Sequence, residues 1–101
     1  MTKFLKTNYN QTIAYNKIDG EKLGIVFLSG LKSDMTGQKA VALEEWAVEN
    51  NHSFLRFDYS GHGISSGKFN DFVISDWILD AKTIITKSVS YTHLRAHETD
   101  S

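Results

Sequence analysis

The sequence lacks cysteine, and it lacks any excess of one charge. Without cysteine the chain has no disulfide framework and no thiolate chemistry, which fits a reducing compartment. Eleven Lys and Arg residues stand against twelve Asp and Glu residues, so the formal net charge is −1. This balance gives no indication of a surface that binds nucleic acids or anionic membranes.

Long apolar runs are missing as well. No stretch approaches the ~20 apolar residues that span a bilayer. Residues 1–7 are too polar for a signal peptide and lack the Arg-rich, amphipathic character of a transit peptide. We therefore expect a cytoplasmic protein. With 101 residues, the chain has room for one domain with a modest core.

Two strand-like patterns come early in the chain. Residues 12–16 alternate like a half-buried strand, and Asp19 with Gly20 is a turn signal of the hairpin type. Residues 23–28 then form a short, continuous apolar run. Such a run is typical of a strand that is buried on both faces in a parallel sheet.

A helix is predicted after the apolar run. Residues 31–37 are polar and offer three candidate N-cap side chains: Ser33, Asp34 and Thr36. Apolar side chains then recur at helical spacing: Ala40, Leu43, Trp46 and Ala47. The glutamates of this helix are expected to face away from the core: Glu44, Glu45 and Glu49. The helix ends at Asn50 and Asn51.

A second strand is predicted over residues 54–57, so strand, helix and strand form a βαβ unit with parallel strands and a right-handed crossover. A glycine-rich loop over residues 59–67 follows. Apolar spacing predicts a second helix over residues 74–85 with its cap near Ser75. Two tryptophans lie on the apolar stripes of the two helices and are expected in the core: Trp46 and Trp77.

The character of the chain changes after residue 87. Residues 88–101 have neither helical nor strand periodicity, although a doubly wound fold should continue here with another buried strand. We interpret this stretch as a tail foreign to the domain, similar to a translated sequencing-adaptor stretch. Its candidate metal ligands do not match the H-E-x-x-H order on a helix, so no metal site is expected from His93, His97 and Glu98.

Two segments carry a family resemblance. Residues 27–40 (FLSGLKSDMTGQKA) resemble the third strand and oxyanion loop of α/β-hydrolases. Residues 56–67 (RFDYSGHGISSG) resemble their fourth strand and the turn after it, and Asp76–Trp77 suits the next helix. The combination is most similar to the acyl-glucuronide esterase and palmitoyl-protein thioesterase group with its bacterial relatives. Residues 1–87 are then the N-terminal part of an α/β-hydrolase domain with a mostly parallel sheet.

The resemblance implies a serine hydrolase that cleaves esters or thioesters of small-molecule or acylated substrates without a cofactor or metal. It also implies a mitochondrial location, in place of the cytoplasmic one, if the chain is a eukaryotic member of this group whose transit peptide is missing. In such enzymes the nucleophile elbow G-x-S-x-G follows the fifth strand, and the acid and histidine come later. Residues 1–87 stop before that strand, so we predict that the chain alone is inactive. The implied catalytic group in this part is the backbone N–H of Leu31, after Gly30, as an oxyanion donor, with Lys32 as the next candidate.

An apparent elbow does occur, because residues 63–67 (GISSG) match G-x-S-x-G letter for letter. An elbow serine lies directly between a strand and a helix, whereas Ser65 has loop residues on both sides. We therefore interpret Ser65 as a decoy in a glycine-rich turn. Asp58, His62 and Ser65 are also too close in sequence for the geometry of a triad. Asp58 is expected to accept backbone N–H bonds, and His62 to be a loop residue near the pocket.

A different class of function stays open: a short, non-enzymatic βαβ module that binds a partner. Against the module stands the unpaired sheet edge that it would leave where a fifth strand should lie. A genomic reading frame that continues past residue 87 into an apolar strand and G-x-S-x-G favours the fragment, and a stop codon near residue 101 favours the module. A third alternative is an acyltransferase or haloperoxidase-like enzyme with the same opening, and the opening strands cannot separate these activities, because fold does not fix function. The sequence gives no oligomeric state.

Overall fold

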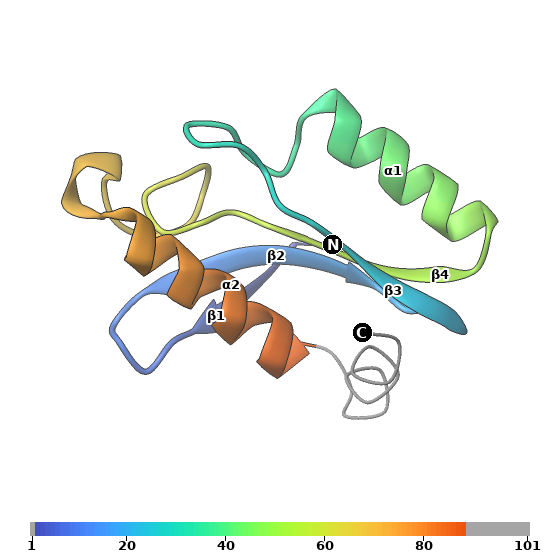
Figure 1. Cartoon of the computed structure of the whole chain (residues 1–101), viewed down its shortest axis with the longest axis horizontal. Helices are drawn as coiled ribbons and strands as arrows, with labels where there is room; N and C mark the ends of the chain where they lie inside the picture. Colours follow the sequence, from blue (N-terminus) through green and yellow to red (C-terminus); the bar gives the residue numbers. More distant parts are fainter. Residues whose placement is uncertain (1, 89–101) are drawn as a thin grey trace.

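A computed structural model describes residues 2–88, which form a four-stranded mixed sheet with one helix on each side (Figure 1). The strand order is β1-β2-β4-β3. The strands are β1 (Lys3–Lys6), β2 (Thr12–Ile18), β3 (Lys22–Phe27) and β4 (His52–Phe57). The helices are α1 (Gln38–Glu49) and α2 (Ile74–Ser88), with a 3-10 turn, η1 (Phe69–Asp71), before α2. The predicted tail from residue 89 onward, with its histidines, lies outside the described residues.

The antiparallel part of the sheet corrects one prediction. β1 pairs with β2, and β2 pairs with β4, both antiparallel. The turn signal at Asp19–Gly20 is not a hairpin, because β2 and β3 lie on either side of β4 and do not pair with each other. Gly20 instead passes so close to the backbone of Asn51 and His52 that a Cβ has no room there. Glycine at position 20 therefore reflects the close approach of the β2–β3 connection to the start of β4.

The predicted βαβ unit is confirmed, because β3, α1 and β4 follow one another and β3 pairs with β4 in parallel. α1 ends where predicted, with Asn50 as C-cap and Asn51 at a φ of 62°. The predicted N-caps are wrong, because Gly37 precedes the helix and no side chain caps it. Asp34 instead accepts hydrogen bonds from the N–H and hydroxyl of Thr36 within the loop, and these bonds lower the pKa of its carboxyl.

The exposure of β3 corrects the prediction that this strand is buried on both faces. Within residues 2–88 β3 pairs only with β4, and none of its residues is buried: Lys22 and Leu23 are exposed, and the other four are partly exposed. Leu28, directly after it, is 55% exposed. A continuous apolar run therefore identified the strand correctly but not its position in the sheet.

The fully buried residues of α1 are small. Ala40 and Ala47 are fully buried, whereas Trp46 is 48% exposed and stacks on the ring of His52 with 5.2 Å between centroids. The predicted core position of Trp46 is thus wrong, because alanines allow the helix to approach the sheet closely and leave the larger side chain outside. Glu44 also departs from prediction, because it faces the sheet and pairs with Arg56.

The core lies between the sheet and α2. Ile13 of β2, Leu55 and Phe57 of β4, and Ile84 of α2 form its buried centre. α2 confirms the predicted second helix. Trp77 is only 7% exposed, as the apolar stripe of that helix predicted. This packing fixes the beginning of α2 beside the loops that follow β3 and β4.

Candidate functional site

Two loops leave the sheet at the same end of its strands, because β3 and β4 are parallel and their carboxyl ends lie together (Figure 1). The first loop, residues 28–37, is called the β3 loop below. The second, residues 58–68, is called the β4 loop. Ligands of open α/β sheets bind beyond the carboxyl ends of the strands, so these two loops are the natural place for a site.

The tip of the β3 loop holds the oxyanion candidate. The N–H of Ser33 donates to the carbonyl of Gly30 at 3.0 Å and closes a tight turn around Leu31 and Lys32. Lys32 has a φ of 63°, and its ammonium group lies 5.0 Å from the centre of the Phe69 ring. Among residues 2–88, nothing accepts a hydrogen bond from the N–H of Leu31. That donor is therefore available to an acceptor from outside the described part of the chain.

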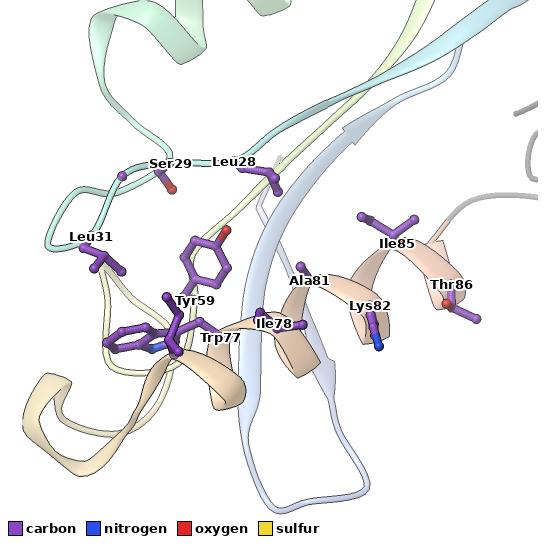
Figure 2. Close-up of a pocket in the computed structure, with 12 residues that line it drawn as sticks. Leu28, Ser29, Leu31, Tyr59, Trp77, Ile78, Ala81, Lys82, Ile85 and Thr86 are labelled. Carbon is purple, nitrogen blue, oxygen red and sulfur yellow. The ribbon is translucent and has the colours of Figure 1, made fainter. Parts of the chain in front are cut away.

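An apolar cavity of about 670 Å³ opens beside this tip. Figure 2 shows Leu28 and Leu31 of the β3 loop on one side, side chains of α2 on the other, and the ring of Tyr59 between them. Burial raises the pKa of the Tyr59 hydroxyl, and the nearby charge of Asp80 adds to this effect. The cavity is lined mainly by carbon atoms.

Asp58 connects the two loops. Its carboxylate is 1% exposed and accepts hydrogen bonds from the N–H of Met35 at 2.8 Å and from the N–H of Ile64 at 3.1 Å. The backbone bonds predicted for Asp58 are thus confirmed. Gly63, with a φ of 47°, lies against this carboxylate, and a Cβ there would collide with it.

Ser65 has both hydrogen-bonding directions of its hydroxyl in use. Its Oγ donates to the carbonyl of Asp58 at 2.6 Å and accepts from the N–H of Ala14 at 2.9 Å. The next two residues of the motif also have partners within the fold. Ser66 binds Gln11 and Thr12, and Gly67, with a φ of 87°, lies against the Phe72 ring. These contacts attach the β4 loop to β2 and to the turn before β2. The residues that match G-x-S-x-G therefore have a structural role here.

His62 is buried but does not complete a proton relay. It is 4% exposed, and its Nδ1 lies 3.1 Å from the carbonyl oxygen of Ser60, so Nδ1 carries the proton of that bond. Its ring contacts the rings of Tyr59, Phe69 and Trp77. Within residues 2–88, no side-chain hydrogen bond joins His62 to Ser65 or Asp58. The structure thus brings these three residues into one loop but not into the contacts of a triad.

A second buried carboxylate was not foreseen from the sequence. Asp80 is fully buried and accepts from the N–H of Ser60 at 2.7 Å, the hydroxyl of Ser60 at 3.0 Å and the hydroxyl of Tyr9 at 2.6 Å. Burial, together with the bond to Asp80, raises the pKa of Tyr9 to about 12. Trp77 also donates to the carbonyl of Ser60 at 3.0 Å, so α2 holds the β4 loop at two points. A signal was present, because Asp80 interrupts the apolar stripe of α2.

No group of three or more His, Cys, Asp or Glu side chains suited to a metal occurs within residues 2–88. The helices of that part are too short or too polar to cross a membrane.

Comparison with known proteins gives relatives of much greater length, and no family model matches. Palmitoyl-protein thioesterase ABHD10, mitochondrial, from Rattus norvegicus is 40% identical over 82 residues, 81% of this chain and 28% of that protein. The Homo sapiens protein of the same name is 41% identical over 73 residues, 72% of this chain and 24% of that protein. Alpha/beta hydrolase domain-containing protein 10 from mouse superposes with a TM-score of 0.85 at 36% identity, covering 89% of this chain and 36% of its own. The chain thus spans about a quarter of the length of the curated relatives.

Proposed function

The chain belongs to the α/β-hydrolase superfamily, and we propose that it is the N-terminal part of a serine hydrolase that cleaves carboxylic ester or thioester bonds. The observation that carries the proposal is the β3 loop. Its Leu31 N–H has no acceptor within residues 2–88, and it lies beside an apolar cavity at the carboxyl edge of the sheet. A free backbone donor beside an apolar cavity is what an acyl-transfer site offers a carbonyl oxygen.

The contribution proposed for this chain is electrostatic stabilisation of the charge that develops on the substrate carbonyl oxygen. In hydrolysis of an ester or thioester, a serine attacks the carbonyl carbon, a histidine moves the proton, and negative charge develops on the carbonyl oxygen. The Leu31 N–H is proposed as one donor to that oxygen, and Lys32 as the next candidate. No cofactor or metal takes part in this scheme.

Ser65 is proposed as a structural residue and not as the nucleophile. Its hydroxyl proton is used by the Asp58 carbonyl, and among residues 2–88 no basic side chain forms a hydrogen bond with it. An attacking serine needs its proton to face a base, as in the Ser-His pair of known hydrolases. We propose that nucleophile, acid and histidine are supplied by residues outside this chain, which is therefore inactive alone.

The substrate proposed is an acylated small molecule or protein. The name palmitoyl-protein thioesterase on the relatives supports a thioester with a long acyl chain, and the apolar lining near Leu31 is compatible with it. The same names include the word mitochondrial, which favours the mitochondrial alternative over the cytoplasmic prediction.

The test is covalent labelling of the full-length gene product with a fluorophosphonate, which reacts with activated serines. Peptide mapping should place the adduct on a serine outside residues 2–88 and leave Ser65 unmodified. The 101-residue chain alone should take up no label. An adduct on Ser65 in either protein would overturn the proposal, and a gene that ends near residue 101 would favour the binding module.

A further inference from the structure

Met35 of the β3 loop is held from three directions. Its side chain is 1% exposed, and its N–H donates to Oδ1 of Asp58 at 2.8 Å. Its carbonyl oxygen accepts from Nη1 of Arg56 at 2.6 Å, and its sulfur lies 3.9 Å from the amide nitrogen of Asn16. Both backbone groups of Met35 are thus bound by charged side chains from the end of β4. Hydrogen bonds of this kind are stronger than those between neutral groups.

Arg56 is itself fixed by α1. Its Nε and Nη2 each lie 3.2 Å from an oxygen of the Glu44 carboxylate, which is a two-point ion pair. The two side chains are only 13% and 17% exposed, so little solvent weakens the pair. In the parallel register Arg56 lies opposite Phe27, one residue before the β3 loop begins. Arg56 therefore connects α1, which follows the β3 loop, to the β3–β4 strand pair, which precedes that loop.

Asp58 is fixed from the opposite side. The second oxygen of its carboxylate accepts from Ile64, and Gly63 leaves just enough room for it. The carboxylate therefore transmits the position of the β4 loop to the β3 loop through Met35.

We propose that Asp58 and Arg56 are positioning residues: together they hold Met35 and thereby fix the Leu31 N–H where it meets the oxyanion. The inference rests on the proposed function for the role of Leu31. The loop from residue 28 to 34 is anchored by β3 at one end and by Met35 at the other, with the Ser33–Gly30 bond closing its tip. An oxyanion donor must be set before the charge develops, since a displaced donor loses most of its effect.

The first experiment uses the 101-residue chain and does not depend on catalysis. Hydrogen–deuterium exchange is compared for Asp58→Asn, Arg56→Lys and the matched control Asp19→Asn, which makes the same chemical change at a side chain that is 87% exposed. We expect both test variants to speed exchange of the Met35 amide about tenfold, the effect of one lost charge-assisted bond. The control should exchange like wild type. Unchanged exchange in folded Asp58→Asn and Arg56→Lys would overturn the inference.

The second experiment uses the full-length gene product and a thioester substrate. If the loop positions an oxyanion donor, Asp58→Asn and Arg56→Lys should lower kcat at least about tenfold with little change in KM, since the donor acts mainly in the transition state. Loss of folding alone would lower the active fraction, which active-site titration with fluorophosphonate measures separately. Faster exchange with unchanged kcat per active site would overturn the catalytic link, and with it the role proposed for Leu31, while leaving the anchoring of Met35 intact.

If Asp58→Asn does not fold, Arg56→Lys decides the matter. It keeps the positive charge beside Glu44 but lacks the planar guanidinium that reaches both Glu44 and Met35. Normal exchange at Met35 and normal kcat in that variant contradict the inference.

Discussion

The Ser65 hydroxyl donates a hydrogen bond to the backbone carbonyl of Asp58 at 2.6 Å, so the apparent nucleophile is bonded to the residue that begins its own loop. The bond is local, buried and satisfied at both ends. A sequence motif for a catalytic serine and a buried turn can therefore share the same five letters. What separates them is the element on either side of the serine, which here is loop.

Replacing Ser65 with alanine is expected to lower stability. The change leaves the Ala14 N–H and the Asp58 carbonyl without a buried partner, which costs about 1–3 kcal/mol of unfolding free energy. Urea denaturation of the chain measures the loss. Ser75→Ala is the matched control, because Ser75 is exposed, and it should unfold like wild type. Equal stability of Ser65→Ala and Ser75→Ala would contradict a structural role for Ser65.

Gly63→Ala should be more damaging than an ordinary glycine substitution. The φ of 47° alone costs a side-chain residue about 1–3 kcal/mol, and the new Cβ also displaces the Asp58 carboxylate. Gly30→Ala is the comparison, since its Cβ would have its nearest neighbour, Ser33 Oγ, at 3.8 Å. Thermal unfolding should show a clear fall in Tm for Gly63→Ala and a small change for Gly30→Ala. A similar Tm for both variants would refute the close approach of Asp58.

Tyr9 should ionise late and couple stability to alkaline pH. Its neutral form is favoured in the folded chain by burial and by the bond to Asp80, and its pKa rises from 10.0 to about 12. The stabilisation is therefore complete below about pH 10 and is lost as the pH rises through about 12. The tyrosinate absorbance of wild type minus Tyr9→Phe should titrate near pH 12. A midpoint near 10 would contradict both the burial of the phenol and its bond to Asp80.

The Arg56–Glu44 pair should show measurable coupling. A double-mutant cycle with Arg56→Ala and Glu44→Ala is expected to give about 1 kcal/mol or more, because the pair is two-pointed and largely buried. The Lys17–Asp19 pair is the control, since Asp19 is 87% exposed and such surface pairs contribute about 0.2–1 kcal/mol. Equal coupling in the two cycles would mean that Arg56 is held by Met35 alone.

Periodicity predicted most of the helices and strands, but it did not predict which side chains of each element are buried. The apolar run of β3 and the stripe of α2 identified a strand and a helix correctly. The same reasoning missed β1, because an edge strand with Phe4 56% exposed shows little alternation. It also placed Trp46 in the core, because a stripe indicates which side chains share a face and not which of them reach the sheet.

The sequence predicted the kind of hydrogen bond that some residues of the site make, but it did not predict their distant partners. The sequence indicated that Asp58 accepts backbone N–H bonds and that Ser65 lies in a turn, but it did not indicate that Met35 and Ala14 donate to them. The bonds from Tyr9 to Asp80 and from Arg56 to Met35 and Glu44 join distant segments, and only the folded chain brings them together. A polar residue within an apolar stripe, as at Asp80, is the one signal that sequence offers for such a bond.

Our central proposal is that residues 2–88 carry an oxyanion donor of an α/β-hydrolase and that the nucleophile is not among them. The most direct test is turnover of an acyl thioester and of an activated ester by the purified 101-residue chain, measured beside Ser65→Ala. We predict no turnover above background in either protein. Turnover by the wild-type chain that disappears in a folded Ser65→Ala variant would contradict the claim and make Ser65 the nucleophile.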